Sequence, residues 1–308
     1  MKRINRGLHI IILLCFSSLT WGQLQPLLDQ FHLDGLAINP AFAGSQEALN
    51  VGLHSRNQWV GFNGAPVTNT LSVHSPLRNK SQNLGIILMT DKLGSQREIG
   101  LQLNYAYRFD LFNGKLSLGL SAGFTNISDD INSIISTDPG DLLLLDPMNR
   151  MTLPEFSTGA YYYDNKFYLG FSMPWFLSHY ASDDQTSYRL GFNAREANYL
   201  LTSGYIFRVS KELELFPMFL LMSNPANSTH LDLQCNLIYM EKFWMGAGVR
   251  SNGGLNALVQ LQINPQLRIG YSYGYELSEL SSYQSGTHEI ILQYNFRYLV
   301  DVFSPRYF

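Results

Sequence analysis

One five-residue stretch has the spacing of a catalytic serine motif. Gly119-Leu120-Ser121-Ala122-Gly123 matches G-x-S-x-G, in which a strained strand-to-helix turn exposes the serine as a nucleophile. Here the match lies inside a run of alternating polar and apolar residues, and no helical pattern follows it. Small residues on the inner face of a strand explain the stretch better, so we predict no catalytic role for it.

Two further groups of residues have side-chain types that bind metal ions. The segment 127–154 contains several aspartates, and His288 is followed directly by Glu289. Clustered carboxylates can bind Ca²⁺, but no EF-hand spacing is present and a solvated acidic loop is the simpler interpretation. His288-Glu289 lacks the second histidine of a zinc helix and lies in a strand pattern. The sequence therefore predicts no enzyme activity, no cofactor and no metal site.

The elements that carry these residues are most regular between Leu231 and Tyr298. Five segments of about ten residues each alternate apolar with small or polar side chains, and short turns join them. Because successive side chains on a strand point to opposite faces, each segment has one apolar face. Such a series is typical of a transmembrane β-barrel.

The same pattern continues through the rest of the chain. We predict 14 strands, an even number as expected of a bacterial single-chain barrel. They span 49–59, 67–75, 83–92, 97–109, 115–126, 155–164, 166–175, 197–209, 212–222, 229–240, 242–251, 254–263, 266–276 and 286–298. The fold class is thus all-β, an antiparallel outer-membrane barrel closed by its first and last strands.

Composition agrees with a barrel in lipid. Only 15% of the 308 residues are charged, whereas 45% are hydrophobic and 13% aromatic. A soluble domain typically has about 25% charged residues. A soluble β-sandwich is the alternative, but it seldom needs so many evenly spaced strands.

The N-terminus has the features of a signal peptide. Three cations precede a short apolar run, and small residues follow it up to Gly22. We predict a signal peptide over 1–22, an N-terminal periplasmic lead-in over 23–48 and a barrel over 49–308. Loss of the three cations would take the formal charge from −3 to about −6, so nucleic acid is not an expected partner. Export without a membrane helix points to the outer membrane of a Gram-negative cell, with lipid around the barrel.

Loop lengths predict the orientation of the barrel. The even-numbered connections between strands are short, whereas the odd-numbered ones include the long segments 127–154 and 176–196. Bacterial barrels have short periplasmic turns and longer external loops, so we expect these two segments outside the cell.

The predicted inner face of the barrel is polar and rich in glycine. Its members include His54, Arg56, Gln58, Gln102, Asn104, Arg108, Ser117, Gly119, Ser121, Gly123, Asp232, Gln234, Asn236 and Arg250. Such a face fits either a narrow water-filled passage or a packed, plugged interior. Cys235 falls on the outer face and is expected to behave as a small lipid-facing hydrophobe.

Several blocks of sequence resemble one known family. They are NPAFAGS (39–45), RNQWVGFNGAPVT (56–68), SVHSPL (72–77), LSLGLSAGF (116–124), EKFWMGAGVRS (241–251), INPQLRIGYSYGY (263–275), SSYQSGTHEIIL (281–292) and SPRYF (304–308). Together they resemble the PorP/SprF family of type IX secretion system membrane proteins. Residues from about 127 to 196 match this family poorly.

The resemblance implies an outer-membrane barrel that helps a dedicated machine to export or retain surface proteins. Implied partners are an adhesin-like cargo protein with a C-terminal sorting domain and other components of the system. The residues of the matching blocks could contact partners or shape the barrel. They are Asn39, Pro40, Gly44, Arg56, Gln58, Trp59, Gly61, Pro66, His74, Pro76, Gly286, His288 and Glu289.

Two other functions fit a barrel of this kind. One is a diffusion channel for small solutes, and the other is an outer-membrane enzyme. The sequence offers no plausible Ser/His/acid set for the enzyme.

Overall fold

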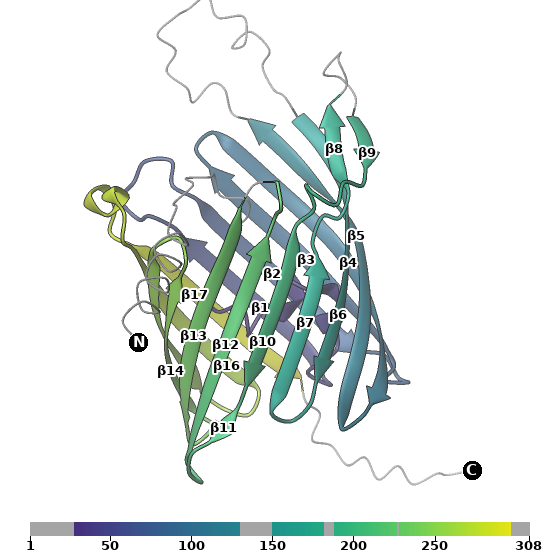
Figure 1. Ribbon diagram of the computed structural model, residues 1–308, viewed down its shortest axis with the longest axis vertical. Coiled ribbons are helices and arrows are strands. Elements are labelled where there is room, and N and C mark those ends of the chain that lie inside the picture. Colours follow the sequence, from purple (N-terminus) through teal and green to yellow (C-terminus); the bar gives the residue numbers. More distant parts are fainter. Residues whose placement is uncertain (1–27, 130–149, 182–187, 227, 297–308) are drawn as a thin grey trace, which may run out of the picture.

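The computed structural model describes residues 28–129, 150–181, 188–226 and 228–296, and it is a closed antiparallel barrel (Figure 1). Its wall strands are β1 (Leu49–Asn57), β2 (Val67–Pro76), β3 (Gln82–Leu93), β4 (Gln96–Leu111), β5 (Gly114–Asp129), β6 (Arg150–Tyr163), β7 (Phe167–Met173), β10 (Tyr199–Tyr205), β11 (Phe207–Arg208), β12 (Leu213–Ser223), β13 (Thr229–Tyr239), β14 (Phe243–Arg250), β15 (Gly254–Gln262), β16 (Leu267–Glu276) and β17 (Thr287–Phe296). Because β10 and β11 form one wall strand interrupted at Ile206, the barrel has 14 strands.

Each neighbour along the chain is a neighbour in the wall, and β1 pairs with β17 to close it. Leu49 lies opposite Phe296 and Asn57 opposite His288, so the seam is paired along the whole of β1. Closure leaves no open edge with unpaired backbone groups, as a sheet in lipid requires. The predicted strand count and closing pair are therefore confirmed.

The structure differs from the predicted boundaries at the ends of three long strands and in one loop. β4 and β5 extend to Leu111 and Asp129, and β6 begins at Arg150. The predicted loop 176–196 contains a small hairpin of β8 (Ser178–Ala181) and β9 (Tyr188–Gly191), which pair only with each other. The rest of the aspartate-rich loop and the predicted signal peptide lie outside the described residues.

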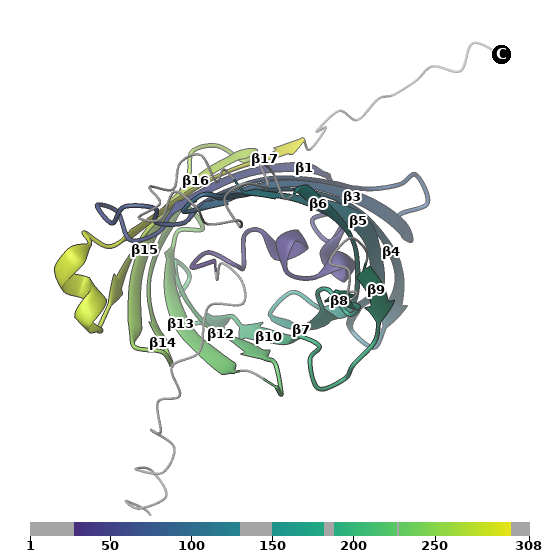
Figure 2. The ribbon, with the colours of Figure 1, turned by 90° about the horizontal axis from the view of Figure 1, so that it is seen from above.

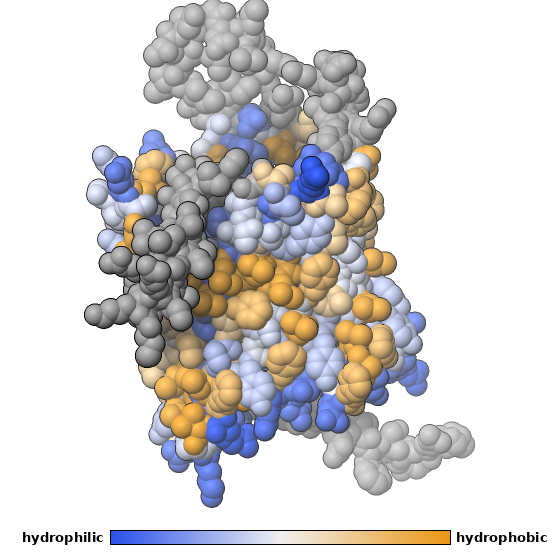
Figure 3. All heavy atoms as spheres, viewed as in Figure 1, coloured by the Kyte–Doolittle hydropathy of each residue, from blue (hydrophilic) through white to orange (hydrophobic). Residues whose placement is uncertain are grey.

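Alternation along the strands gives the barrel two different faces. On β5, Leu118 and Leu120 are exposed outward, whereas Ser117 and Ser121 are buried inside. A band of hydrophobic side chains crosses the outer surface at mid-height, with hydrophilic residues below it (Figure 3). Such a band is what the acyl chains of a bilayer contact. Among the described residues, no helix is long and apolar enough to cross a membrane.

The two ends of the barrel differ in their connections. The short-turn end has the tight connections 77–81, 112–113, 164–166, 209–212, 240–242 and 263–266. The long-loop end has the β8–β9 hairpin and the 3-10 helix η5 (Glu279–Tyr283) (Figure 1). We expect the short-turn end to face the periplasm.

Residues 28–48, which we call the plug, lie inside the barrel (Figure 2). The plug contains two short 3-10 helices, η1 (Gly35–Ala37) and η2 (Pro40–Phe42), and most of its side chains are buried. The sequence predicts a periplasmic lead-in over 23–48, and in the structure the described part of that segment, 28–48, lies within the lumen. Of the two interiors that the sequence allows, the structure has the plugged one.

Candidate functional site

The plug crosses the lumen from the long-loop end to the short-turn end. Asp29 lies beside Arg56, near the last residue of β1, and beside Asn256 at the start of β15. The plug then descends and enters β1 at Leu49. A protein segment thus occupies the space where a solute would have to pass.

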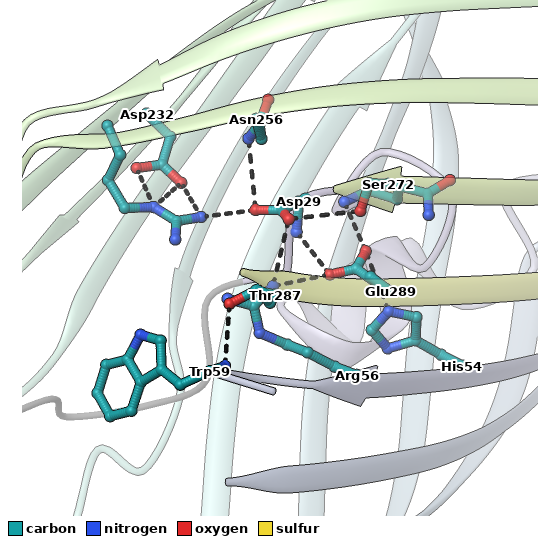
Figure 4. A network of polar contacts seen from close by, with 11 residues as sticks. Asp29, His54, Arg56, Trp59, Asp232, Asn256, Ser272, Thr287 and Glu289 are labelled. Atoms are coloured by element: carbon teal, nitrogen blue, oxygen red, sulfur yellow. Dashed lines mark hydrogen bonds and ion pairs between the residues drawn. The ribbon is translucent and has the colours of Figure 1, made fainter. Parts of the chain in front are cut away.

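Glu289 on β17 is the centre of the contact between plug and wall (Figure 4). Its carboxylate accepts hydrogen bonds from the backbone N–H groups of Asp29, at 3.0 Å, and Gln30, at 2.9 Å. Nη1 of Arg56, directly opposite on β1, donates to the same carboxylate at 3.0 Å. His54 Nε2 lies 3.1 Å from its other oxygen. Glu289 is fully buried, so its hydrogen bonds to the seam and to the plug are both shielded from solvent.

The Asp29 side chain extends this network to the opposite side of the seam. Its carboxylate lies 3.3 Å from Arg56 Nη1 and 3.1 Å from Arg250 Nη2. Arg250 Nε in turn donates to both oxygens of Asp232, at 2.9 Å each. Asn256 and Ser272 donate to Asp29 as well, each at 3.3 Å.

The two arginines of this network, Arg56 and Arg250, each have a carboxylate partner on the wall itself. Arg56 has Glu289 as its partner, and Arg250 has Asp232. Asp29 is therefore an additional carboxylate shared between two pairs that are already formed. A buried charge is costly mainly when it is left alone, so the wall would keep its paired state if the plug left.

The opposite part of the inner wall holds the plug by hydrophobic contact. Leu28 and Phe31 of the plug belong to one buried cluster with inward-facing residues of β10, β12 and β13. The wall residues of this cluster are Leu200, Phe216, Met218, Leu220, Met222 and Ile238. This patch departs from the uniformly polar inner face that the sequence predicts.

The NPAFAG block anchors the middle of the plug. The Asn39 side chain accepts from the Ala41 N–H at 2.9 Å and so caps η2, whose first residue is Pro40. Its amide donates to the carbonyls of Ala160 and Phe171 on β6 and β7, at 3.0 and 3.3 Å.

Gly119, the first glycine of the catalytic-type motif, faces η2. A Cβ placed on Gly119 would lie 2.2 Å from the Ala41 nitrogen, so only glycine allows the plug to approach the wall here. The prediction of small inward-facing residues on this strand is thus confirmed, and the plug gives it a physical reason.

The end of the plug is held at the short-turn end. Gly44 has a left-handed φ of 70°; its N–H donates to His74 Nδ1 at 3.1 Å, and its carbonyl accepts from Arg108 at 2.9 Å. Glu47 pairs with Lys115 at the edge of the barrel, and this hydrogen bond lowers the pKa of the Glu47 carboxyl. His74 therefore contacts the plug, while any contact of this residue with a partner protein stays a prediction.

The first hairpin contains the next group of predicted residues. Gln58 is buried, and its backbone N–H donates to the Pro66 carbonyl at 3.0 Å, which closes the loop 58–66. Trp59 and Gly61 have left-handed φ values of 49° and 94°. These residues shape the loop, while any contact with a partner stays a prediction.

The remaining predicted residues lie apart from the plug. Gly286, with φ of 95°, accepts from the Val60 N–H at 2.9 Å, and Tyr273 packs against it. His288 points outward, and its Nδ1 lies within hydrogen-bond distance, 2.7 Å, of the hydroxyl of Tyr271 on the outer face. Pro76 ends β2 opposite Asn83. His288 and Glu289, adjacent in sequence, thus serve opposite faces of β17.

Sequence reasoning missed Asp29 and the apolar inner patch. Asp29 lies in a segment without periodicity, so no pattern places it in the lumen. The patch had a signal, because Leu215–Met222 is almost continuously apolar and such a run predicts a strand buried on both faces.

The site has the chemistry of a structural latch. Within the described ranges, no group of three His, Cys, Asp or Glu side chains is placed to hold a metal ion. The carboxylates of the network are occupied by arginines and backbone N–H groups, so the arrangement can bind and orient a segment of protein.

Comparisons with known proteins place the chain. Among solved structures, it is similar to the CymD monoaromatic hydrocarbon channel, with 14% identity, a TM-score of 0.53, and 86% of this chain and 93% of that chain covered. It is also similar to the outer membrane protein Omp33 of Acinetobacter baumannii, with 9% identity, a TM-score of 0.48, and 81% and 98% covered. At these identities the likeness concerns the fold alone. No curated protein matches the chain.

A family model, described as type IX secretion system membrane protein PorP/SprF, matches residues 21–294. That match covers most of the chain, including the plug and the wall strands as far as residue 294 of β17. The chain is therefore an outer-membrane β-barrel that belongs to the PorP/SprF family of type IX secretion system membrane proteins.

Proposed function

We propose that this protein is a non-enzymatic outer-membrane component of the type IX secretion system that assists export or surface attachment of specific secreted proteins by binding protein at its rims. The cargo would be adhesin-like and have a C-terminal sorting domain, and other components of the system would bind at the periplasmic rim. The observation that carries the proposal is the plug, held by Glu289 inside a barrel of this family.

The plug argues against the rival function of an open diffusion channel. Water and small solutes need a continuous polar passage, but the plug contacts the wall on both its polar and its apolar sides. The cavity beside the plug near Glu155 and Trp175 has a volume of only about 60 Å³, and a larger cavity of about 360 Å³ lies at the short-turn end. Neither has room for a folded protein, so the surfaces left for binding a cargo protein are the two rims.

The loop 58–66 offers a rigid contact surface at the long-loop end. Its Val60 exchanges backbone hydrogen bonds with Ser285 and Gly286, at 2.7 and 2.9 Å, and its Gly64 carbonyl accepts from the Gly94 N–H at 2.9 Å. Phe62 on this fixed loop is 43% exposed. An exposed apolar side chain on a rigid loop suits a protein partner, because little conformational entropy is lost on binding.

A deletion strain tests the proposed role. We expect loss of one or more surface proteins, with uptake of small solutes unchanged, and recovery on expression of the full chain. An unchanged surface proteome would refute the secretion role, and impaired solute uptake with an intact surface proteome would favour the channel.

A matched pair of variants then tests which rim binds the cargo. Phe62→Ser alters the long-loop rim, whereas Phe112→Ser alters an exposed phenylalanine in a turn of the short-turn end. If cargo is held at the outer rim, only Phe62→Ser reduces the surface display of the cargo, measured by labelling of intact cells. Equal display in both variants and the unaltered protein would contradict an outer-rim contact through Phe62.

A further inference from the structure

A second concave site lies at the short-turn end of the lumen, between the plug and the inner wall. It is a cavity of about 360 Å³, a volume typical of small-ligand sites. Aromatic side chains dominate its lining: Phe42, Tyr161, Tyr163, Tyr168, Phe216 and Trp244. We call it the aromatic cup.

Among the described residues that line the cup, Arg268 on β16 is the only Asp, Glu, Lys or Arg. Its guanidinium lies 4.6 Å from the centre of the Trp244 ring, and its Nε donates to Gln262 at 2.7 Å. Among residues of the described ranges, no carboxylate lies within 4.0 Å of it. Arg56 and Arg250, at the other end of the lumen, each pair with a carboxylate. Arg268 differs from them because its charge has no such partner in the described part of the chain.

The cup also contains polar atoms that the described part of the chain leaves without a hydrogen-bond partner. They are His32 Nδ1, Ser45 Oγ, Tyr168 Oη and Trp244 Nε1, all buried. Buried polar atoms normally have a partner, so this concentration around one cavity marks a place where a ligand would supply several hydrogen bonds.

We propose that the aromatic cup binds the C-terminal residue of a peptide with an aromatic or bulky apolar side chain. The Arg268 guanidinium holds the carboxylate, because its planar fork matches the two oxygens. The aromatic walls contact the side chain of that residue. The hydroxyl and ring N–H groups without partners form hydrogen bonds with the last peptide group before it. The cup lies at the short-turn end, away from the long-loop rim. This proposal therefore does not depend on the proposed binding of cargo at that rim.

Charge and polarity select this ligand over others. Because the cup has one cation without a carboxylate partner, it disfavours cationic and neutral ligands. Because no second cation lines it among the described residues, a doubly charged phosphate is disfavoured as well. A fatty acid would satisfy Arg268 and the aromatic walls, but it would leave the remaining polar atoms unpaired.

Calorimetry on the purified full chain in detergent tests the site. The probe is N-acetyl-Gly-Gly-Phe, compared with its C-terminal amide and with decanoate. Because a hydrogen-bonded carboxylate is lost in the amide, we expect the acid to bind at least about tenfold more tightly than the amide and than decanoate. Equal binding of acid and amide, or tighter binding of decanoate, would overturn the proposal without any variant.

Variants at the same end of the barrel add a second test. Arg268→Gln should lose the preference for acid over amide, and Arg268→Lys should retain part of it. The control is Arg208→Gln, an exposed arginine of β11 that pairs with Glu214 outside the cup and should bind like the unaltered protein. An Arg268→Gln protein that keeps the preference refutes the assigned role of this arginine. The acid and amide comparison on the unaltered protein decides the case if that variant does not fold.

Discussion

The two sides of the inner wall hold the plug by different physical means. On the seam side, Glu289, Arg56 and Arg250 contact Asp29 and the adjacent backbone through directional charged hydrogen bonds. On the β10–β12–β13 side, a patch rich in leucine and methionine covers Leu28 and Phe31 without any such bond.

The two sides thus have different effects: one fixes the position of the plug along the wall, and the other supplies its affinity for the wall. Hydrogen bonds to one carboxylate fix which plug residue faces which strand, because the N–H groups of consecutive residues must both reach it. Hydrophobic burial is non-directional and scales with area, so the apolar side supplies attraction without fixing the register. The charged pairs of the wall exist without the plug, whereas the apolar patch would face water if the plug left. The apolar side therefore opposes an open aqueous state through the area that water would contact, and the charged side opposes it through the plug hydrogen bonds that would be lost.

Removal of Glu289 should have the largest effect. Glu289→Ala removes the nearer carboxylate of Arg56 and leaves Asp29, at 3.3 Å, as its partner. It also takes the acceptor from two plug N–H groups, and each buried donor left without a partner costs about 1–3 kcal/mol. We expect amide hydrogen exchange over residues 28–33 to rise by about two to three orders of magnitude, since each 1.4 kcal/mol is a factor of ten.

His288→Ala is the matched control for this change. The residue is adjacent on β17 but faces outward toward Tyr271, so exchange in the plug should not change. Equal exchange in the Glu289→Ala and His288→Ala proteins would show that the latch does not hold the plug.

Truncation of Phe31 should have the next largest effect. Phe31→Ala removes a buried ring from the apolar patch, and such changes cost about 3 kcal/mol. Faster exchange should then extend over the whole first part of the plug, while Arg56 and Glu289 remain paired at the seam. Faster exchange confined to the residues beside Glu289 would contradict the view that the apolar side supplies the attraction.

Neutralisation of Asp29 should have the smallest effect. Asp29→Asn keeps the size of the side chain and leaves both wall arginines with their own carboxylates. We expect a cost of about 1 kcal/mol, seen as roughly a fivefold rise in exchange at residues 28–33. An effect as large as that of Glu289→Ala would mean that the wall pairs are not independent of the plug.

The wall of this barrel is predictable from sequence, because the alternation of polar and apolar residues within each strand is enough to identify its inner and outer faces. Ser117, Gly119 and Ser121 alternate with Leu118 and Leu120, and a period of two places them on opposite faces wherever the strand lies. Strand count and closure follow from the sum of such segments.

The latch is not predictable in the same way. Arg56 and Glu289 lie 233 residues apart, and they become opposite neighbours only when β1 closes on β17. Asp29 has no periodic context, so its place in the lumen depends on charges contributed by distant strands. The inner patch at Phe216, Met218 and Met222 was within reach, because alternation fails in β12 where both faces are apolar.

Single-channel recording in planar bilayers tests the central claim, that the plug closes the barrel. The full chain should show little or no steady conductance, and Glu289→Ala should show openings that His288→Ala does not. A large, steady conductance from the unaltered protein would contradict a closed lumen and would favour a diffusion channel.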